Sequence, residues 1–218
     1  MKTRFELIIF DWDGTLSDSV GLITDLMIQS FLLHDVIPPS RMEVADILGI
    51  KLSEAFKILL KEKNQNASEL ILNSYINLYN QSSNKVKLFD GVDLGIKELH
   101  RYGYKIAIAT GGGRSYLNGC LAQTSIKDYI SVTKTSDDCF SKPHPQMCNE
   151  IMNELIIEPE KSIVIGDSIH DLQMAKNAGI ASLAVTYGAH KQDSLSIYGS
   201  LEYMDDANMV FDWIRKHG

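Results

Sequence analysis

The sequence of 218 residues predicts an α/β fold, with a doubly wound parallel sheet core and an inserted all-helical cap domain. Short apolar runs, typical of buried parallel strands, alternate with segments of helical periodicity along most of the chain. Residues 18–84 break this alternation, because they carry helical patterns only. We therefore expect residues 1–17 and 85–218 to form the core and residues 18–84 to form the cap.

The core strands are predicted by continuous apolar runs, which are typical of strands buried on both faces. The first run is 7–10, and it is followed by runs at 105–109, 162–165 and 181–185 and a weaker one at 129–132. Helical patterns separate these runs at 92–102, 114–123, 144–155 and 169–178. The C-terminal tail, 202–218, is expected to form a last amphipathic helix.

Four helices are predicted for the cap, at 20–34, 41–48, 52–63 and 68–80. Pro38 and Pro39 separate the first two, since proline interrupts a helix. Three serines stand where helix N-caps are expected, at positions 40, 53 and 68.

Composition narrows the class of protein. Hydrophobic residues make up 44% and charged residues 22% of the chain, which is typical of a globular protein. The 28 acidic against 21 basic residues leave a net charge of −7, so we expect no nucleic-acid partner. No apolar run approaches the ~20 residues of a membrane span. The N-terminus lacks a secretory pattern, so a cytoplasmic location is expected.

Carboxylates cluster where two of the predicted strands end. Asp11 and Asp13 follow the first strand, and Asp167 and Asp171 follow the run 162–165. Like charges this close require either a proton or a cation between them. Oxygen ligands without a cysteine or histidine cluster favour Mg²⁺, which commonly also binds phosphate oxygens. Considered separately, an Asp-Gly turn and a helix N-cap remain the alternative interpretations.

Two further segments suit an anionic substrate. Thr110 and Gly111 open a glycine-rich stretch before a helix, whose N–H groups can hold a phosphate oxygen. Lys142 precedes Pro143 and is thereby restricted to an extended conformation, where it can neutralise a phosphate. Each segment alone is also compatible with a flexible loop or a surface lysine.

Taken in chain order, these motifs resemble those of the haloacid dehalogenase-like hydrolase superfamily over residues 5–188. The residues that carry the resemblance are Phe10-Asp11-Trp12-Asp13-Gly14-Thr15-Leu16, Thr110, Lys142-Pro143 and Gly166-Asp167 to Asp171. The helical insert is similar to the helical-cap subfamily, and to phosphoglycolate-phosphatase-like proteins in particular.

The resemblance implies a role for each motif residue. Asp11 would be the nucleophile that forms an aspartyl-phosphate, and Asp13 the acid and base. Thr110, Gly111 and Lys142 would bind the phosphoryl group. Asp11, the backbone carbonyl of Asp13 and Asp167 would bind Mg²⁺, with Asp171 supporting the metal or Lys142.

The sequence also departs from the family pattern. Gly111 stands where an Asn is common, and Gly112 stands where relatives carry a Lys, a loss that Arg114 could offset. Lys51 lies in the cap loop where related caps often meet the substrate, and His170 could line the edge of the pocket.

The expected function is Mg²⁺-dependent hydrolysis of a small phosphomonoester, such as a phosphoglycolate-like compound or a sugar phosphate. A phosphosugar mutase and a non-catalytic binding or regulatory protein remain as alternatives. A dehalogenase is disfavoured, because Asp13 is the acid that a phosphate ester needs. Nucleoside monophosphates and pyrophosphate also remain as substrates.

Overall fold

The computed structural model describes residues 5–60, 65–82 and 87–218, and it contains a six-stranded parallel sheet of order β3-β2-β1-β4-β5-β6. The strands are β1 (Leu7–Phe10), β2 (Lys105–Thr110), β3 (Val132–Thr135), β4 (Ser162–Gly166), β5 (Ala181–Val185) and β6 (Tyr203–Met204). The strand order reverses direction at β1, so the predicted doubly wound α/β fold is confirmed.

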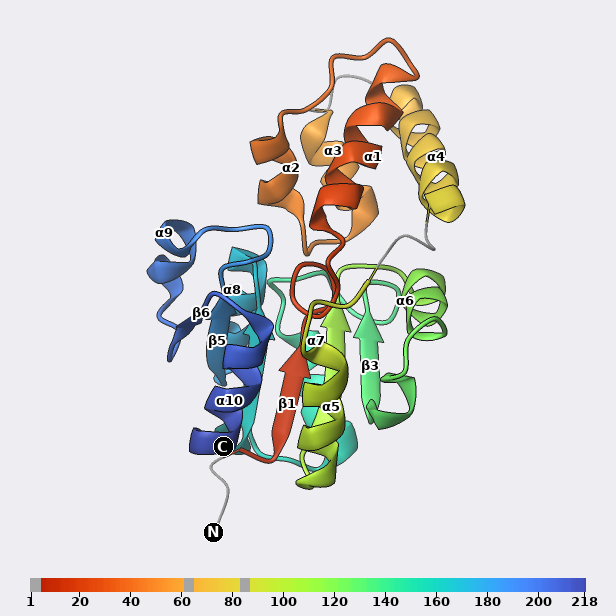
Figure 1. Ribbon diagram of the computed structural model, residues 1–218. Coiled ribbons are helices and arrows are strands. Elements are labelled where there is room, and N and C mark those ends of the chain that lie inside the picture. The colour runs from red at the N-terminus through yellow and green to blue at the C-terminus, as the bar shows by residue number, and fades with distance from the viewer. Residues whose placement is uncertain (1–4, 61–64, 83–86) are drawn as a thin grey trace.

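Helices cover both faces of the sheet. On one face, seen in front in Figure 1, α5 (Val92–Arg101) and α10 (Ala207–His217) pack on the side chains of Ile8 and Phe10, with α6 (Arg114–Leu121) beside them. On the other face, α7 (Gln146–Leu155) and α8 (Ile169–Asn177) pack on Leu7 and Ile9. Alternate residues of β1 thus supply two separate cores, as the side-chain period of a strand requires.

A bundle of four helices stands over the carboxyl ends of the strands (Figure 1). Its members are α1 (Val20–Leu32), α2 (Arg41–Ile47), α3 (Leu52–Leu59) and α4 (Gln65–Ser82). They share an apolar core of their own, in which the Phe31 and Phe56 rings lie 5.9 Å apart. We call this bundle the cap; the predicted division at residues 18 and 84 stays a prediction.

Several local predictions need correction. Ser40 forms the expected capping box with Glu43, but α3 begins at Leu52 with Lys51 before it, so Ser53 is not its cap. Ser68 lies inside α4, which begins at Gln65. The predicted third cap helix extended to residue 63, and residues 61–63 lie outside the described ranges.

In the core, β3 begins three residues later than the predicted run at 129–132, and residues 127–129 form a 3₁₀ turn instead. The strand β6 and the short helix α9 (Gln192–Leu195) were not predicted. Two further 3₁₀ turns occupy Pro159–Lys161 and Ser196–Tyr198. Within the described ranges, no helix is long and apolar enough to cross a membrane.

Candidate active site

The register of the central strands brings the predicted motifs together. Phe10 of β1 pairs with Ile108 of β2 and with Ile165 of β4, so these strands end at one edge of the sheet. Asp11 follows β1, and Asp167 follows β4, and both are buried. Ligands bind at this edge in open α/β sheets, and the cap covers it here.

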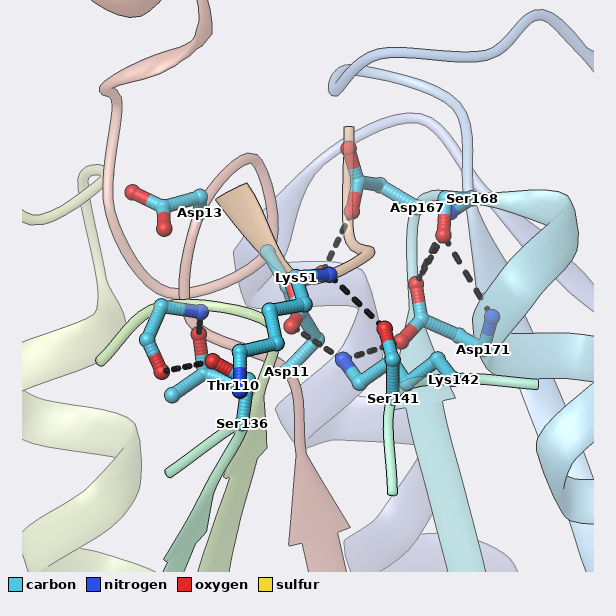
Figure 2. A network of polar contacts seen from close by, with 12 residues as sticks. Asp11, Asp13, Lys51, Thr110, Ser136, Ser141, Lys142, Asp167, Ser168 and Asp171 are labelled. Carbon is cyan, nitrogen blue, oxygen red and sulfur yellow. Dashed lines mark hydrogen bonds and ion pairs between the residues drawn. The ribbon is translucent and has the colours of Figure 1, made fainter. Parts of the chain in front are cut away.

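Lys142 lies between two of the carboxylates (Figure 2). Its Nζ donates to Asp11 Oδ1 at 2.5 Å and to Asp171 Oδ1 at 2.6 Å, and all three residues are buried. Burial alone would lower the pKa of Lys142, but the charges of Asp11 and Asp171 outweigh it and raise that pKa. Lys142 therefore stays protonated beside the predicted nucleophile.

Asp167 and Asp171 are each fixed by neighbouring donors. Thr15 Oγ1 donates to Asp167 Oδ1 at 3.2 Å, and the backbone N–H of Ala189 donates to Asp167 Oδ2 at 2.6 Å. Ser168 Oγ donates to Asp171 Oδ2 at 2.5 Å within a capping box at the start of α8. The two carboxylates thus keep fixed positions at the end of β4.

The three buried carboxylates fit a divalent cation. Oxygen atoms of Asp11, Asp167 and Asp171 lie within 4.8 Å of one another. Burial raises the pKa of Asp11 well above its usual value, and the charges of Asp171 and Asp167 add to it against the opposing charge of Lys142. The ammonium of Lys142 balances only one of the three negative charges, so a further cation would stabilise the ionised carboxylates. A donor set made only of oxygen atoms suits a hard metal ion.

A pH-dependent effect of Mg²⁺ on stability follows from Asp167. Burial, and then the charge of Asp171, raises the pKa of Asp167 from 3.8 to about 7. Without metal, this carboxyl stabilises the fold below pH 4, and that stability is lost as the pH rises through 7. Mg²⁺ favours the charged carboxylate, so we expect it to raise Tm more at pH 8 than at pH 5.

The measurement is thermal unfolding in Mg²⁺ and in EDTA at each pH. A difference of several degrees is expected, since about 1 kcal/mol shifts the Tm of a domain this size by roughly 2–4 °C. Asp167→Asn should reduce the Mg²⁺ effect at pH 8. An Mg²⁺ effect of equal size at both pH values would contradict the assignment.

Asp13 is held apart from this group. Its Oδ1 accepts hydrogen bonds from Ser19 Oγ at 2.6 Å and from the Tyr116 hydroxyl. Burial raises the pKa of Asp13, against the opposing effect of both hydrogen bonds. A carboxyl with a raised pKa suits an acid that donates a proton. The expectation that its backbone carbonyl binds the metal stays a prediction.

Tyr116 was not predicted from the motifs, and it lies 103 residues from Asp13 in the sequence. The sequence carries no local signal for this contact, but the structure explains the glycine at position 112. A Cβ built at Gly112 would lie 2.5 Å from Cδ1 of the Tyr116 ring, so a side chain there would collide with it. The missing side chain at position 112 thus makes room for the tyrosine that contacts Asp13.

The remaining candidates take different positions. Thr110 is buried, and its Oγ1 accepts from the Gly112 N–H at 3.0 Å. Arg114 is directed to Thr133 and Asp138, so it does not take the place of the lysine missing at position 112.

Two of the candidates join the cap to the core. The backbone N–H of Lys51 donates to Ser141 Oγ at 2.7 Å. His170 Nε2 lies 2.9 Å from the backbone oxygen of Asp46 in the cap. The expected contact of the Lys51 side chain with substrate stays a prediction.

The cap loop at Gly49 and Ile50 packs closely against Gly111. A Cβ at this position would lie 2.3 Å from the backbone oxygen of Gly49 and 2.7 Å from that of Ile50, so the loop would have to retreat. We expect Gly111→Ala to lower kcat/KM by about 10- to 100-fold through misplacement of the closed cap, with little change in Tm. Gly21→Ala is the control, because its added Cβ meets nothing within 4 Å. An unchanged kcat/KM would show that this contact is not needed.

A cavity of about 390 Å³ lies between the cap and the core. Asp11, Asp13, Thr110 and Gly111 line its core side. The carboxylates, the glycine-rich loop and a closed cap therefore define an α/β enzyme with its site enclosed between two layers of structure.

Comparison with known proteins assigns the family. The family model of haloacid dehalogenase-like hydrolases matches residues 8–185, and the chain belongs to this family. A phosphoglycolate phosphatase from Vibrio vulnificus is 32% identical over 201 residues, covering 86% of each chain. Pyrophosphatase PpaX from Halalkalibacterium halodurans is 28% identical over 187 residues, covering 85% of this chain and 86% of that protein.

A solved structure has the same fold. A hydrolase from Pseudomonas syringae aligns with a TM-score of 0.87 at 22% sequence identity, covering 97% of this chain and 98% of that one. The predicted family is thus confirmed, and so is the prediction of an enzyme, a hydrolase of the phosphatase type. The roles of the individual site residues stay predictions.

Proposed function

We propose that the protein is a Mg²⁺-dependent phosphatase that hydrolyses a small phosphomonoester through an aspartyl-phosphate on Asp11. The observation that carries this proposal is the buried Asp11 carboxylate, which is paired with Lys142 and opens onto the cavity that Asp13 also lines. The phosphatase and pyrophosphatase names of the relatives support phosphoryl transfer.

In the first step, an Asp11 oxygen attacks phosphorus and the bond from phosphorus to the ester oxygen breaks. Asp13, protonated, gives its proton to the departing oxygen, so the product is an alcohol. Water then attacks phosphorus, Asp13 takes its proton, and the bond to Asp11 breaks to release inorganic phosphate. Thr110, Gly111 and Lys142 hold the phosphoryl oxygens throughout.

The metal is assigned to Asp11, Asp167 and the backbone carbonyl of Asp13, with Asp171 in support. When bound, Mg²⁺ supplies charge that offsets the repulsion between an anionic nucleophile and an anionic phosphate. The small-molecule substrate, the absence of a nucleic-acid partner and the cytoplasmic location are part of the same proposal.

The test is the release of inorganic phosphate from a panel of phosphomonoesters, with Mg²⁺ and with EDTA. In added methanol, a common aspartyl-phosphate predicts one ratio of methyl phosphate to inorganic phosphate for all esters. Release that needs Mg²⁺, with a constant ratio, is the expected result. No release from any ester would contradict the proposal, and sugar-phosphate isomerisation would then test the mutase alternative.

A further inference from the structure

The walls of the cavity above Asp11 are mostly apolar. Most of the wall is formed by apolar side chains of α1, α2, α3 and the loop between α2 and α3: Ile23, Met27, Ile47, Leu48, Ile50 and Leu52. Asn80, Ser115 and Gln123 add a few polar groups. Ile23 and Met27 are 5% and 2% exposed, so the inner wall lies away from bulk water. At about 390 Å³ the cavity is within the ~300–1,000 Å³ typical of ligand pockets, which leaves room beyond a phosphoryl group.

As far as the structure describes the chain, the cavity wall beyond the phosphoryl end offers no cation to a substrate. Among its lining residues in the described part of the chain, none is a lysine, arginine or histidine. The ionisable carboxylates there are Asp11, Asp13 and Asp137. The ammonium of Lys142 is engaged at the phosphoryl end, between Asp11 and Asp171. A second anionic group on the substrate would therefore lose its hydration without gaining a cation.

One polar group of the wall has no partner. Tyr75 is 6% exposed and lines the cavity, and its hydroxyl has no hydrogen-bond partner among residues 5–60, 65–82 and 87–218. Burial, with the nearby charge of Asp13, raises the pKa of Tyr75, so the hydroxyl stays neutral. A hydroxyl that faces the cavity and bonds no protein group can hydrogen-bond a neutral atom of a ligand.

We propose that the group esterified to phosphate is a neutral alcohol with an apolar or aromatic body, which excludes substrates with a second anionic group. The inference rests on the proposed phosphatase activity and names its substrate class. The proposed substrate differs from those in the names of the relatives, since phosphoglycolate carries a carboxylate and pyrophosphate a second phosphate. It also disfavours sugar phosphates, whose several hydroxyls would meet mostly carbon.

The test compares the phosphates of 4-methylphenol and 4-hydroxybenzoate, which are similar in size and differ by one carboxylate. Wild-type enzyme with Mg²⁺ should show a kcat/KM at least about tenfold higher for the 4-methylphenol ester, because the carboxylate has no partner in the cavity. Phosphoglycolate, pyrophosphate and a hexose phosphate form three further arms, each expected to be poorer than the 4-methylphenol ester.

A variant with a positive charge at the cavity wall tests the same inference in the opposite direction. Ile50 lines the cavity from the cap loop and is half-buried, so a lysine can reach from that position while its stem stays at the wall. Ile50→Lys should raise kcat/KM for the 4-hydroxybenzoate ester relative to the 4-methylphenol ester by about tenfold. Ile50→Met, uncharged and of similar length, is the matched control and should keep the wild-type preference.

The outcomes separate the two proposals. Equal or better turnover of phosphoglycolate, pyrophosphate, the hexose phosphate or the carboxylated aryl ester overturns the inference and leaves the phosphatase function standing. Turnover of no ester at all removes the phosphatase function and this inference with it. The wild-type comparison decides the question even if Ile50→Lys does not fold.

Discussion

Asp11→Asn is expected to abolish phosphate release, with a loss of more than about 10⁴-fold in kcat, because an amide is no nucleophile for phosphorus. The substitution keeps the size of the side chain. It also leaves Lys142 paired, since its Nζ still contacts Asp171 at 2.6 Å. Removing one of three clustered carboxylates lowers their mutual repulsion, so the variant should fold.

The measurement is phosphate release with Mg²⁺, alongside circular dichroism to confirm folding. Asp18→Asn is the matched control, because Asp18 is exposed and lies close in the sequence. It should retain wild-type kcat. An Asp11→Asn enzyme that keeps about a tenth or more of its activity would show that water attacks the ester directly and that Asp11 only binds.

The elements that sequence analysis predicted best are those whose signal is local. The strands β1, β2, β4 and β5 are buried on both faces, so their apolar runs are continuous. The edge strand β3 is only partly buried and carries Lys134 among threonines, so its signal is weak. The two residues of β6 are too few to form a pattern.

Helix caps were predicted less well where tertiary contacts set the boundary. Ser53 has the usual chemistry of an N-cap, but α3 begins earlier, at Leu52. The residue before it, Lys51, is bound through its backbone N–H to Ser141 of the core. A contact between residues 90 positions apart leaves no trace in local periodicity.

Part of the candidate site could be predicted from the sequence, and part could not. Asp11, Thr110 and Asp167 could be placed together, because parallel strands present their carboxyl ends at one edge. The cavity walls could not be placed, since Ile23 and Tyr75 have the spacing of ordinary core residues on cap helices. Which of them face the site depends on how the cap sits on Gly111, which only the structure shows.

Asp13→Asn should reduce kcat/KM by about 10²- to 10⁴-fold for an alkyl phosphate, because the departing alkoxide then receives no proton. The loss should be much smaller for 4-nitrophenyl phosphate, whose leaving group departs without a proton. Ser19 and Tyr116 hold the Asp13 side chain and can also donate to an asparagine oxygen. The variant should therefore keep the local geometry and isolate the proton transfer.

The comparison of the two esters separates this role from a merely structural one. A displaced cap or a disturbed metal site would lower both activities by the same factor. A loss that depends on the leaving group locates the defect at cleavage of the bond from phosphorus to the ester oxygen. Equal losses for the alkyl and the 4-nitrophenyl ester would assign Asp13 to binding, and the proton would then have to come from another group that lines the cavity.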